Sequence, residues 1–459
     1  MRDLSDIVKA YDVRGVVPDQ LDERVAAALG AAFTAMLGDP PAVVIGHDMR
    51  TSSVPLAEAF AEGVVTAGAD AVHIGLASTD QLYFASGWLD LPGAMLTASH
   101  NPAEYNGIKL CRAGAAPVSA DTGLADVRTL AEKLLEQPHT AGGATGSSRG
   151  RVIRRDVLAD YASYLRGLVP LTDIRPLTVV VDAGNGMAGH TVPEVLDDPR
   201  LTVVPLYFDL DGTFPNHEAN PIDPENLRDL QAAVVEHQAD LGLAFDGDAD
   251  RCFVVDERGE PANPSALTAL IAVRELANDP GARVVHNLIT SRAVAEIIRE
   301  HGGEPVRTRV GHSFIKQTMA ESGAVFGGEH SAHYYFRDFW RADSGMLAAL
   351  HALAALGEQP AAVSLSVLLA PYERYVSSGE INSTVRDVAA ATAAVRAAFA
   401  DRDGVRTDEL DGLTVEHPDW WFNLRPSNTE PLLRLNAEAV DGVTMERIRD
   451  DVLAIVRGS

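Results

Sequence analysis

Residues 177–198 read LTVVVDAGNGMAGHTVPEVLDD, which is an apolar run, a glycine-rich loop and a helix-like segment in succession. The same layout surrounds AVVIG at residues 42–46 and ARVVH at residues 282–286. Near-continuous Val and Ile runs are typical of strands buried on both faces, and a helix after each strand favours a parallel sheet. We therefore predict three α/β domains of similar plan, whose sequences are too dissimilar to count as a repeat.

The C-terminal part of the chain has a different pattern. Residues 387–399 form an Ala-rich helix-like stretch, whereas residues 413–416 and 432–436 alternate like half-buried strands. A last helix-like segment covers residues 444–456. This pattern predicts a smaller α+β domain with an antiparallel sheet.

Breaks in composition divide the chain into four predicted domains. Residues 137–150 are rich in Gly, Ser and Thr and lack apolar periodicity, which indicates a linker. Proline-containing stretches at 261–264 and 357–360 mark two further breaks. The predicted domains are residues 1–145, 146–258, 259–368 and 369–459.

The charge balance narrows the range of partners. The 459 residues include 38 Lys and Arg against 65 Asp and Glu, which gives a formal net charge of −27. Nucleic-acid binding needs a basic footprint that the chain as a whole lacks, although a local basic pocket for a small anion is compatible with this charge. The two cysteines cannot build a disulfide framework, the N-terminus lacks an apolar signal core, and no apolar run is long enough to span a bilayer. We expect a cytoplasmic protein with no nucleic-acid or membrane partner.

The strongest local signal is DGDADR at residues 246–251, which lies between the apolar stretches 241–245 and 252–255. Three carboxylates at alternate positions of a tight loop can turn their oxygens toward one hard cation such as Mg²⁺. An EF-hand is excluded because Arg251 stands where that loop requires glycine and a strand precedes it. The alternative is a solvated acidic turn, but three like charges this close repel one another without a cation.

Two loops offer nucleophilic and anion-binding groups. In TASHNP at residues 97–102, Ser99 beside His100 suggests a nucleophile with a nearby base, and Lys109 follows closely. The G-x-S-x-G motif that presents the nucleophilic serine in many hydrolases is absent. The alternative to a catalytic Ser99 is therefore a loop that is rich in hydrogen bonds from side chains to the backbone. RPSNTEP at residues 425–431 combines a guanidinium, hydroxyls and an amide, which suits an oxyanion, with an ordinary turn as the alternative.

Three further motifs are ambiguous by themselves. GGEHSAH at residues 327–333 carries groups suited to sugar hydroxyls, with a zinc site as an unsupported alternative. YDVRG at residues 11–15 alone would be a surface turn. GNGMAG at residues 184–189, with Asp209 about twenty residues further on, matches a dinucleotide-binding fingerprint, for which a tight strand-to-helix turn is the alternative.

In this order, the motifs resemble the α-D-phosphohexomutase family, and in particular its bacterial phosphomannomutase/phosphoglucomutase members. The matching pieces run from residue 11 to residue 431, and only their combination is specific. The resemblance implies three related α/β/α domains with mixed, mostly parallel sheets and a smaller C-terminal α+β domain around a central cleft. It implies interconversion of hexose 1-phosphate and hexose 6-phosphate, with mannose and then glucose as the expected sugar. The route runs through an enzyme phosphoserine and a hexose 1,6-bisphosphate, which is both intermediate and activator.

The resemblance also assigns roles to residues of this chain. Ser99 is expected to carry the phosphoryl group, and an oxygen of that phosphoserine is expected to hold Mg²⁺ together with Asp246, Asp248 and Asp250. The expected catalytic residues are Ser99, His100, Lys109, Arg251 and Arg14. The expected substrate-binding residues are Tyr11, His312, Glu329, Ser331, His333, Arg425, Ser427, Asn428 and Thr429.

A sugar hydroxyl needs a base before it attacks phosphorus, and Lys109 suits that role if the site lowers the pKa of its amine.

Two departures from the family pattern bear on the preference for one sugar over another. Ala332 replaces the second glycine of the family's G-E-x-S-G-H loop, and Leu288 stands where some relatives carry Lys.

Other functions compete with the mutase interpretation. Phosphoglucosamine mutase is the alternative within the class. An NAD-linked oxidoreductase built on residues 177–210, or a sugar-phosphate binding protein without catalysis, is the alternative from another class. We expect small sugar phosphates as the binding partners and a monomer or dimer as the assembly.

Overall fold

A computed structural model describes residues 2–136, 149–426 and 432–458 of the chain. The chain forms two compact units, each of which combines separate stretches of sequence. The first unit contains residues 1–262 and 331–368, and the second contains residues 263–330 and 369–459. None of the helices in the described ranges has both the length and the apolar character needed to cross a membrane.

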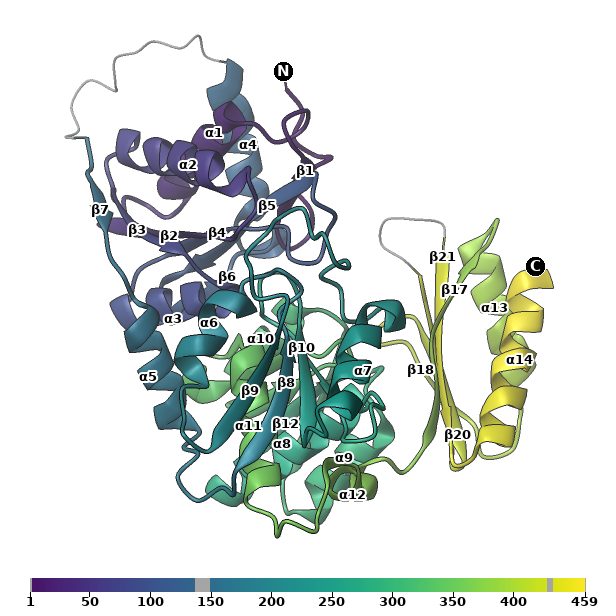
Figure 1. Ribbon diagram of the computed structural model, residues 1–459. Helices are drawn as coiled ribbons and strands as arrows, with labels where there is room; N and C mark the ends of the chain where they lie inside the picture. Colours follow the sequence, from purple (N-terminus) through teal and green to yellow (C-terminus); the bar gives the residue numbers. More distant parts are fainter. Residues whose placement is uncertain (1, 137–148, 427–431, 459) are drawn as a thin grey trace. The chain divides into compact units, whose positions relative to one another are not determined.

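The first sheet of the first unit is mixed. Its strands are β1 (Val13–Val16), β2 (Ala42–His47), β3 (Asp70–Leu76), β4 (Gly93–Leu96), β5 (Tyr105–Arg112), β6 (Ala116–Pro117) and β7 (Val152–Arg154). They lie in the order β1–β5–β4–β2–β3–β7, with β6 beside β5, and β4, β2, β3 and β7 run parallel. Figure 1 shows α1 (Glu23–Met36), α2 (Ser53–Thr66) and α4 (Leu124–Glu136) on one face and α3 (Thr79–Leu89) on the other.

The second sheet of this unit carries the hairpin on which the site is built. Its strands are β8 (Leu177–Asp182), β9 (Leu201–Leu206), β10 (Leu241–Phe245) and β11 (Cys252–Val255), in the order β11–β10–β8–β9. β10, β8 and β9 are parallel, and β10 turns back antiparallel into β11. The unit also contains α5 (Leu158–Leu168), α6 (Ala188–Val195), α7 (Arg228–Glu236), β15 (Tyr334–Phe336), β16 (Ala342–Asp343) and α11 (Gly345–Gly357).

The second unit contains a parallel sheet and an antiparallel sheet. In the first, β12 (Arg283–Asn287) lies between β13 (Glu304–Thr308) and β14 (Phe326–Gly328), accompanied by α8 (Pro264–Asn278), α9 (Arg292–Glu300) and α10 (His312–Ser322). After the short α12 (Leu365–Leu369), the second sheet has the order β17–β21–β20–β19–β18. Its elements are β17 (Val376–Thr384), α13 (Val388–Phe399), β18 (Arg406–Asp408), β19 (Leu413–His417), β20 (Trp420–Pro426), β21 (Leu432–Ala439) and α14 (Gly442–Gly458). The predicted antiparallel sheet is confirmed.

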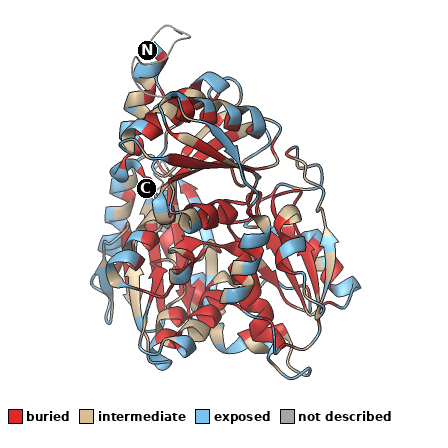
Figure 2. Cartoon of the chain, turned by 90° about the vertical axis from the view of Figure 1, so that its left-hand side faces the viewer, coloured by how far each residue is buried: buried red, intermediate tan, exposed pale blue. Residues whose placement is uncertain are grey.

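Burial follows the apolar runs of the sequence. All residues of β2 and of β10 are buried, as expected for strands that are covered on both faces. Figure 2 shows red along the strands and pale blue along the outer faces of helices. α11 is buried along its whole length, in keeping with the sequence GMLAALHALAALG, which has no polar face. The three predicted strand-and-helix units are confirmed as β2–α2, β8–α6 and β12–α9.

A buried carboxylate, that of Asp80, connects three helices of the first unit. Asp80 lies in the first turn of α3. Its oxygens accept hydrogen bonds from Ser78 Oγ (2.5 Å), Tyr161 Oη on α5 (2.8 Å) and Ser344 Oγ at the N-cap of α11 (2.7 Å). Burial raises the pKa of Asp80 to about 6, although the three hydroxyl donors oppose this shift.

The raised pKa of Asp80 predicts a pH-dependent contribution to stability. The folded protein binds the Asp80 proton more tightly than the unfolded chain does, so the contribution is fully present below pH 3.8 and is lost as the pH rises to about 6. The loss amounts to roughly 3 kcal/mol in the free energy of unfolding. Between pH 4 and pH 7 in urea unfolding, the wild type should therefore lose roughly 2 kcal/mol relative to Asp80→Asn. An identical pH dependence in the two proteins would contradict the raised pKa.

Candidate active site

The Ser99 loop follows the carboxyl end of β4 and leads into β5. Ser99 is buried and has a φ of 51°, a left-handed conformation that is uncommon for residues other than glycine. Its N–H donates to Thr97 Oγ1 (2.9 Å). Its hydroxyl donates to Asp246 Oδ2 (2.9 Å) and lies 3.1 Å from His100 Nδ1. The expected nucleophile therefore points at the carboxylate loop.

The DGDADR loop connects β10 to β11 and buries all three of its carboxylates. One oxygen of each of Asp246, Asp248 and Asp250 lies within 4.8 Å of the others. Among the described residues, no group donates a hydrogen bond to Asp248 Oδ1 or to Asp250 Oδ1, although both atoms are buried. Buried carboxylate oxygens without partners are costly, and oxygens that converge in this way fit a hard divalent cation. The predicted convergence of the three carboxylates is confirmed.

Gly247 brings the carboxylate loop against the Ser99 loop. A methyl group at Gly247 would overlap the carbonyl oxygen of Ser99, so only glycine fits here. The carbonyl of Gly247 accepts the N–H of Met187 (2.9 Å), and a Cβ at Gly186 would come within 2.8 Å of the same oxygen. The glycine-rich segment 184–189 is thus a strand-to-helix turn that supports the carboxylate loop. Its resemblance to a dinucleotide fingerprint has this structural explanation.

Lys109 on β5 places a positive charge between two of the carboxylates. Its Nζ lies 2.6 Å from Asp248 Oδ2 and 2.6 Å from Asp250 Oδ2. Burial alone would lower the pKa of Lys109, but the two carboxylates outweigh burial and raise that pKa well above its ordinary value. The amine is therefore held as an ammonium ion. The condition that we set for a basic Lys109, a lowered pKa, is not met in this arrangement.

The three carboxylates differ in their affinity for protons. Burial raises the pKa of Asp246 to about 7, even though Arg251 opposes the shift. Burial would also raise the pKa values of Asp248 and Asp250, but Lys109 reverses the effect, and both pKa values lie below the ordinary range. Negative charge is consequently concentrated on the two carboxylates that contact the ammonium group.

Burial and two nearby arginines keep His100 uncharged. Arg251 donates from Nε to Asp246 Oδ2 (2.8 Å) and from Nη2 to His100 Nδ1 (2.5 Å). Arg14 Nη1 donates to Asn101 Oδ1 (2.5 Å), one residue further along the loop. Burial, followed by the charges of Arg251 and Arg14, lowers the pKa of His100 well below its ordinary value. His100 is therefore a neutral imidazole whose Nδ1 accepts the hydrogen bond from Arg251.

Ser331 and His333 belong to the same compact unit as these residues. Ser331 Oγ lies 3.1 Å from His333 Nδ1, and His333 Nε2 lies 3.7 Å from Asp250 Oδ1. The backbones of His333 and Arg251 pair in an isolated antiparallel bridge. Asp343 of β16 joins His333 and Asp250 in a second group whose ligand atoms lie within 4.8 Å of one another. The structure thus brings part of the 327–333 motif to the carboxylate loop.

Most of the other expected substrate-binding residues lie in the second unit. Glu329 Oε1 accepts hydrogen bonds from the N–H of Gly311 (3.2 Å) and from Asn287 Nδ2 (3.0 Å). His312 follows Gly311 and begins α10, and Arg425 lies near the end of β20. Of the remaining residues, Tyr11 is half-buried ahead of β1 in the first unit, and Ser427, Asn428 and Thr429 fall outside the described residues.

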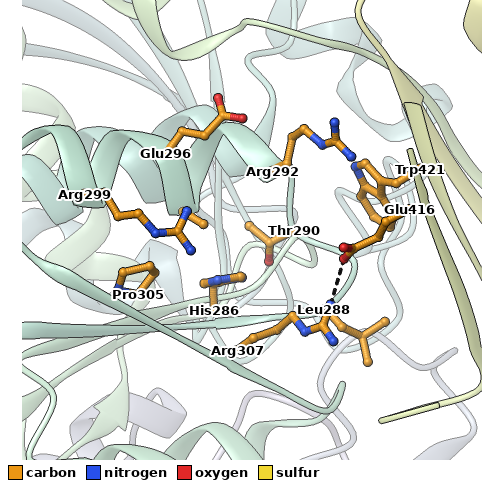
Figure 3. A pocket seen from close by; sticks show the side chains of 11 residues that line it. His286, Leu288, Thr290, Arg292, Glu296, Arg299, Pro305, Arg307, Glu416 and Trp421 are labelled. Atoms are coloured by element: carbon orange, nitrogen blue, oxygen red, sulfur yellow. Dashed lines mark hydrogen bonds and ion pairs between the residues drawn. The ribbon is translucent and has the colours of Figure 1, made fainter. Parts of the chain in front are cut away.

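The structure shows the surroundings of the two residues that depart from the family pattern, Ala332 and Leu288. Ala332 has a φ of 64°, a left-handed conformation that the glycine of the family loop adopts without strain. Leu288 lines a pocket of about 490 Å³ in the second unit (Figure 3). Figure 3 also shows the guanidinium groups of Arg299 and Arg307 at this pocket, the latter hydrogen-bonded to Glu416 (3.0 Å). The position at which some relatives carry Lys is therefore apolar but adjoins two positive groups.

Sequence analysis missed two residues that contact the site. Thr79 Oγ1 donates to Asp248 Oδ2 (2.6 Å), and the guanidinium of Arg50 donates to the carbonyl of Ser99 (2.9 Å). Arg50 follows β2, Thr79 follows β3 and Ser99 follows β4, each at the carboxyl end of a parallel strand. Ligand-binding residues gather at that edge of a parallel sheet, so strand order would have been a usable signal.

Comparison with known proteins places this arrangement in a class. Four family models match successive parts of the chain. They are the phosphoglucomutase/phosphomannomutase alpha/beta/alpha domain I (residues 5–137), domain II (159–259), domain III (263–375) and the C-terminal domain (380–455). Fold and site together define a hexose-phosphate mutase, which is an intramolecular phosphotransferase.

The chain belongs to the phosphoglucomutase/phosphomannomutase family. It is 40% identical over 458 residues to a phosphomannomutase of Escherichia coli, with 98% of each chain covered. It is 41% identical over 452 residues to the phosphohexose mutases protein of Xanthomonas campestris pv. campestris, with 98% of this chain and 99% of that protein covered. A crystal structure of a phosphoglucomutase/phosphomannomutase family protein from Burkholderia thailandensis matches with a TM-score of 0.88 at 34% identity, covering 98% of this chain and 97% of that one. The predicted family and the predicted three α/β/α domains with a smaller C-terminal domain are confirmed.

The close approach of the two loops predicts the effect of enlarging Gly247. Gly247→Ala should lower the free energy of unfolding by roughly 1–3 kcal/mol, the usual cost of overpacking, because the new methyl group overlaps the Ser99 carbonyl. Gly167→Ala on α5 is the matched control, since nothing lies within 4 Å of a Cβ added there. Denaturant unfolding of both variants beside the wild type measures the difference. Wild-type stability in Gly247→Ala would show that the loops are not in contact.

Proposed function

We propose that this protein moves a phosphoryl group between C1 and C6 of a hexose phosphate, with Ser99 as the covalent carrier. The observation that supports this most directly is the hydrogen bond from Ser99 Oγ to Asp246 at a cluster of three buried carboxylates. Lys109 and Arg251 flank the same point with positive charge. A hydroxyl in such surroundings suits phosphoryl transfer, in which charge neutralisation supplies most of the rate acceleration.

We assign a Mg²⁺ ion to Asp246, Asp248, Asp250 and an oxygen of the phosphoserine formed at Ser99. The donor set is all oxygen, and the buried Oδ1 atoms of Asp248 and Asp250, which accept no hydrogen bond from the described part of the chain, support the assignment. When bound, the ion would neutralise charge on the transferring phosphoryl group.

The chemistry divides into two half-reactions. In the first, a sugar hydroxyl attacks phosphorus, the bond from phosphorus to Ser99 Oγ breaks, and the 1,6-bisphosphate forms. In the second, the Ser99 hydroxyl attacks the other phosphate of the bisphosphate, and the bond from that phosphorus to the sugar oxygen breaks. Asp246 Oδ2 is the acceptor for the serine proton, since it lies 2.9 Å from Ser99 Oγ and the pKa of Asp246 is raised to about 7.

The protonation of Lys109 fits the second half-reaction. The departing sugar oxygen needs a proton, and the ammonium between Asp248 and Asp250 can supply one. By microscopic reversibility, the same amine takes the proton of the attacking sugar hydroxyl in the first half-reaction. The raised pKa of Lys109 therefore supports its role as the proton donor in the half-reaction that starts with an unphosphorylated Ser99. We had expected a lowered pKa and an amine that is neutral at rest.

We assign recognition of the sugar and of its non-reacting phosphate to the other predicted residues. Glu329 and Ser331 suit the sugar hydroxyls, while Tyr11, His312 and His333 are further contacts. Arg14 adds positive charge near Ser99. Arg425, with Ser427, Asn428 and Thr429, suits a phosphate that is not reacting, because a guanidinium and hydroxyls bind its oxygens well. Mannose phosphates are the proposed substrates, with glucose phosphates second.

We retain residues 1–145, 146–258, 259–368 and 369–459 as proposed domain boundaries. The four family matches begin and end near these positions and support the partition. The proposed roles then fall one to a domain: the phosphoserine loop, the carboxylate loop, the sugar-recognition loop and the phosphate-binding loop.

The covalent role of Ser99 is testable by substitution. Ser99→Ala should lose nearly all mutase activity while remaining folded, because the carrier hydroxyl is gone. Intact-mass analysis after incubation with hexose 1,6-bisphosphate should show one phosphate on the wild type and none on the variant. Ser5→Ala, at an exposed position, is the control and should retain both properties. Wild-type activity in Ser99→Ala would rule out the covalent route.

The metal assignment predicts a thermal shift as well as an activity. Mg²⁺ should raise the melting temperature of the wild type by mass action, and removal of one ligand in Asp248→Asn should reduce that shift. Activity should vanish in EDTA and return with Mg²⁺. Asp160→Asn, an exposed carboxylate on α5, should shift as the wild type does. An equal Mg²⁺ shift in Asp248→Asn would remove this residue from the metal site.

Assays with mannose, glucose and glucosamine 1-phosphates side by side address the sugar preference. Conversion of mannose 1-phosphate with the highest kcat/KM is the expected result, and a preference for the glucosamine substrate would favour the alternative mutase.

A further inference from the structure

Arg50 is a buried arginine that the mechanism above does not use. It lies in the loop between β2 and α2, and its side chain is only 1% exposed. Its Nη1 donates to the carbonyls of Pro102 (2.8 Å) and Tyr105 (3.0 Å). Its Nη2 donates to the carbonyls of Ser99 (2.9 Å) and Asn101 (2.7 Å). One guanidinium thus binds four carbonyls of the Ser99 loop.

The contact depends on the fork shape of the guanidinium. An arginine has five N–H donors in one plane, and here both terminal nitrogens direct both of their hydrogens at the loop. The remaining Nε lies 3.2 Å from Asp48 Oδ2, which provides a negative charge on the far side. Asp48 in turn accepts the N–H of Arg50 (3.0 Å) and a hydrogen bond from Ser53 Oγ (2.5 Å). A lysine has three donors at one point and cannot reproduce this pattern.

The bonded carbonyls include that of a strained residue. Ser99 has a φ of 51°, and a left-handed conformation costs a residue with a Cβ roughly 1–2 kcal/mol. Such a conformation persists only where the surroundings impose it. The Arg50 bond to the Ser99 carbonyl and the Thr97 bond to the Ser99 N–H hold the two peptide groups that flank the Ser99 Cα. Rotating either peptide group would move Oγ away from Asp246.

A second segment fixes the guanidinium in place. The ring of Phe214 lies beneath Arg50, with 5.0 Å from Cζ to the ring centroid. A Cβ at Gly212 would come within 2.6 Å of the Arg50 Cα, so the backbone of that segment lies directly against the arginine. This cation–π contact, called the stack below, supports the guanidinium without using any of its hydrogens.

We propose that Arg50 is a positioning residue for phosphoryl transfer, which holds the Ser99 loop so that Ser99 Oγ faces the carboxylate cluster. The proposal rests on the proposed function of Ser99. Arg50 contacts neither substrate nor Oγ in this role, so its effect passes entirely through the backbone of residues 99–105.

Arg50→Lys is the decisive variant because it keeps the charge and removes the fork. The expected result is a fall in kcat of about ten- to a hundredfold with KM changed by less than about threefold, since a misplaced nucleophile slows transfer without removing substrate contacts. Phosphate incorporation at Ser99 from hexose 1,6-bisphosphate, followed by intact mass, should slow by the same factor. A merely structural role would lower the melting temperature and leave the kcat of the folded enzyme unchanged.

Arg175→Lys is the matched control. Arg175 is half-buried and paired with Asp240 (2.7 Å), away from the Ser99 loop. Its kcat should stay at the wild-type value. If Arg50→Lys fails to fold, Phe214→Leu takes its place, because it removes only the stack: a smaller fall in kcat at constant KM supports the proposal, and a wild-type kcat overturns it.

Ser99→Ala, measured in the same series, separates the two levels of the argument. An active Ser99→Ala overturns the proposed covalent function, and the Arg50 proposal with it. An inactive Ser99→Ala together with a wild-type kcat and phosphorylation rate in Arg50→Lys overturns the positioning role alone. An inactive Ser99→Ala with slowed phosphorylation in Arg50→Lys supports both.

Discussion

Burying three carboxylates side by side is strongly unfavourable unless positive charge is buried with them, and in this protein Lys109 supplies part of that charge. The lysine comes from β5 of the first sheet, whereas the aspartates come from the hairpin of the second sheet. The ion pairs therefore require β5 and the β10–β11 loop to lie at a closely defined distance from each other. Gly247 allows that approach, because any side chain at this position would overlap the Ser99 carbonyl.

The charged groups around Ser99 lie together in one compact unit, whereas the groups suited to recognition are divided between the two units. The first compact unit contains Ser99, Lys109, the three aspartates and Arg251, and each of these residues forms a hydrogen bond with at least one of the others. Glu329, His312 and Arg425 lie in the second. The proposed chemistry thus uses a preorganised set of charges that lies within one unit.

The sequence predicts the fold well where one physical rule dominates. Buried parallel strands require continuous apolar runs, so β2, β8 and β12 are visible in the sequence, and the spacing of the aspartates indicates their convergence. Other features depend on tertiary contacts that no local pattern records. The ammonium state of Lys109 comes from two carboxylates more than a hundred residues away, and the left-handed Ser99 is maintained by Arg50 from the end of another strand. Likewise, the glycines of 184–189 match a dinucleotide pattern for separate local reasons: Gly184 has a φ of 52°, whereas a Cβ at Gly186 or at Gly189 would overlap the backbone of Gly247 or of Phe208.

The hydrogen bond from Ser344 to Asp80 joins residues 264 positions apart and has a consequence for how the chain is made. Residues 331–368 belong to the first unit, yet they follow a stretch of the second. During synthesis, residues 263–330 of the second unit are made before α11 and Ser344. The core of the first unit is therefore completed only after that segment has left the ribosome. A nascent chain that stops before residue 345 would expose the apolar surface that α11 covers in the complete protein.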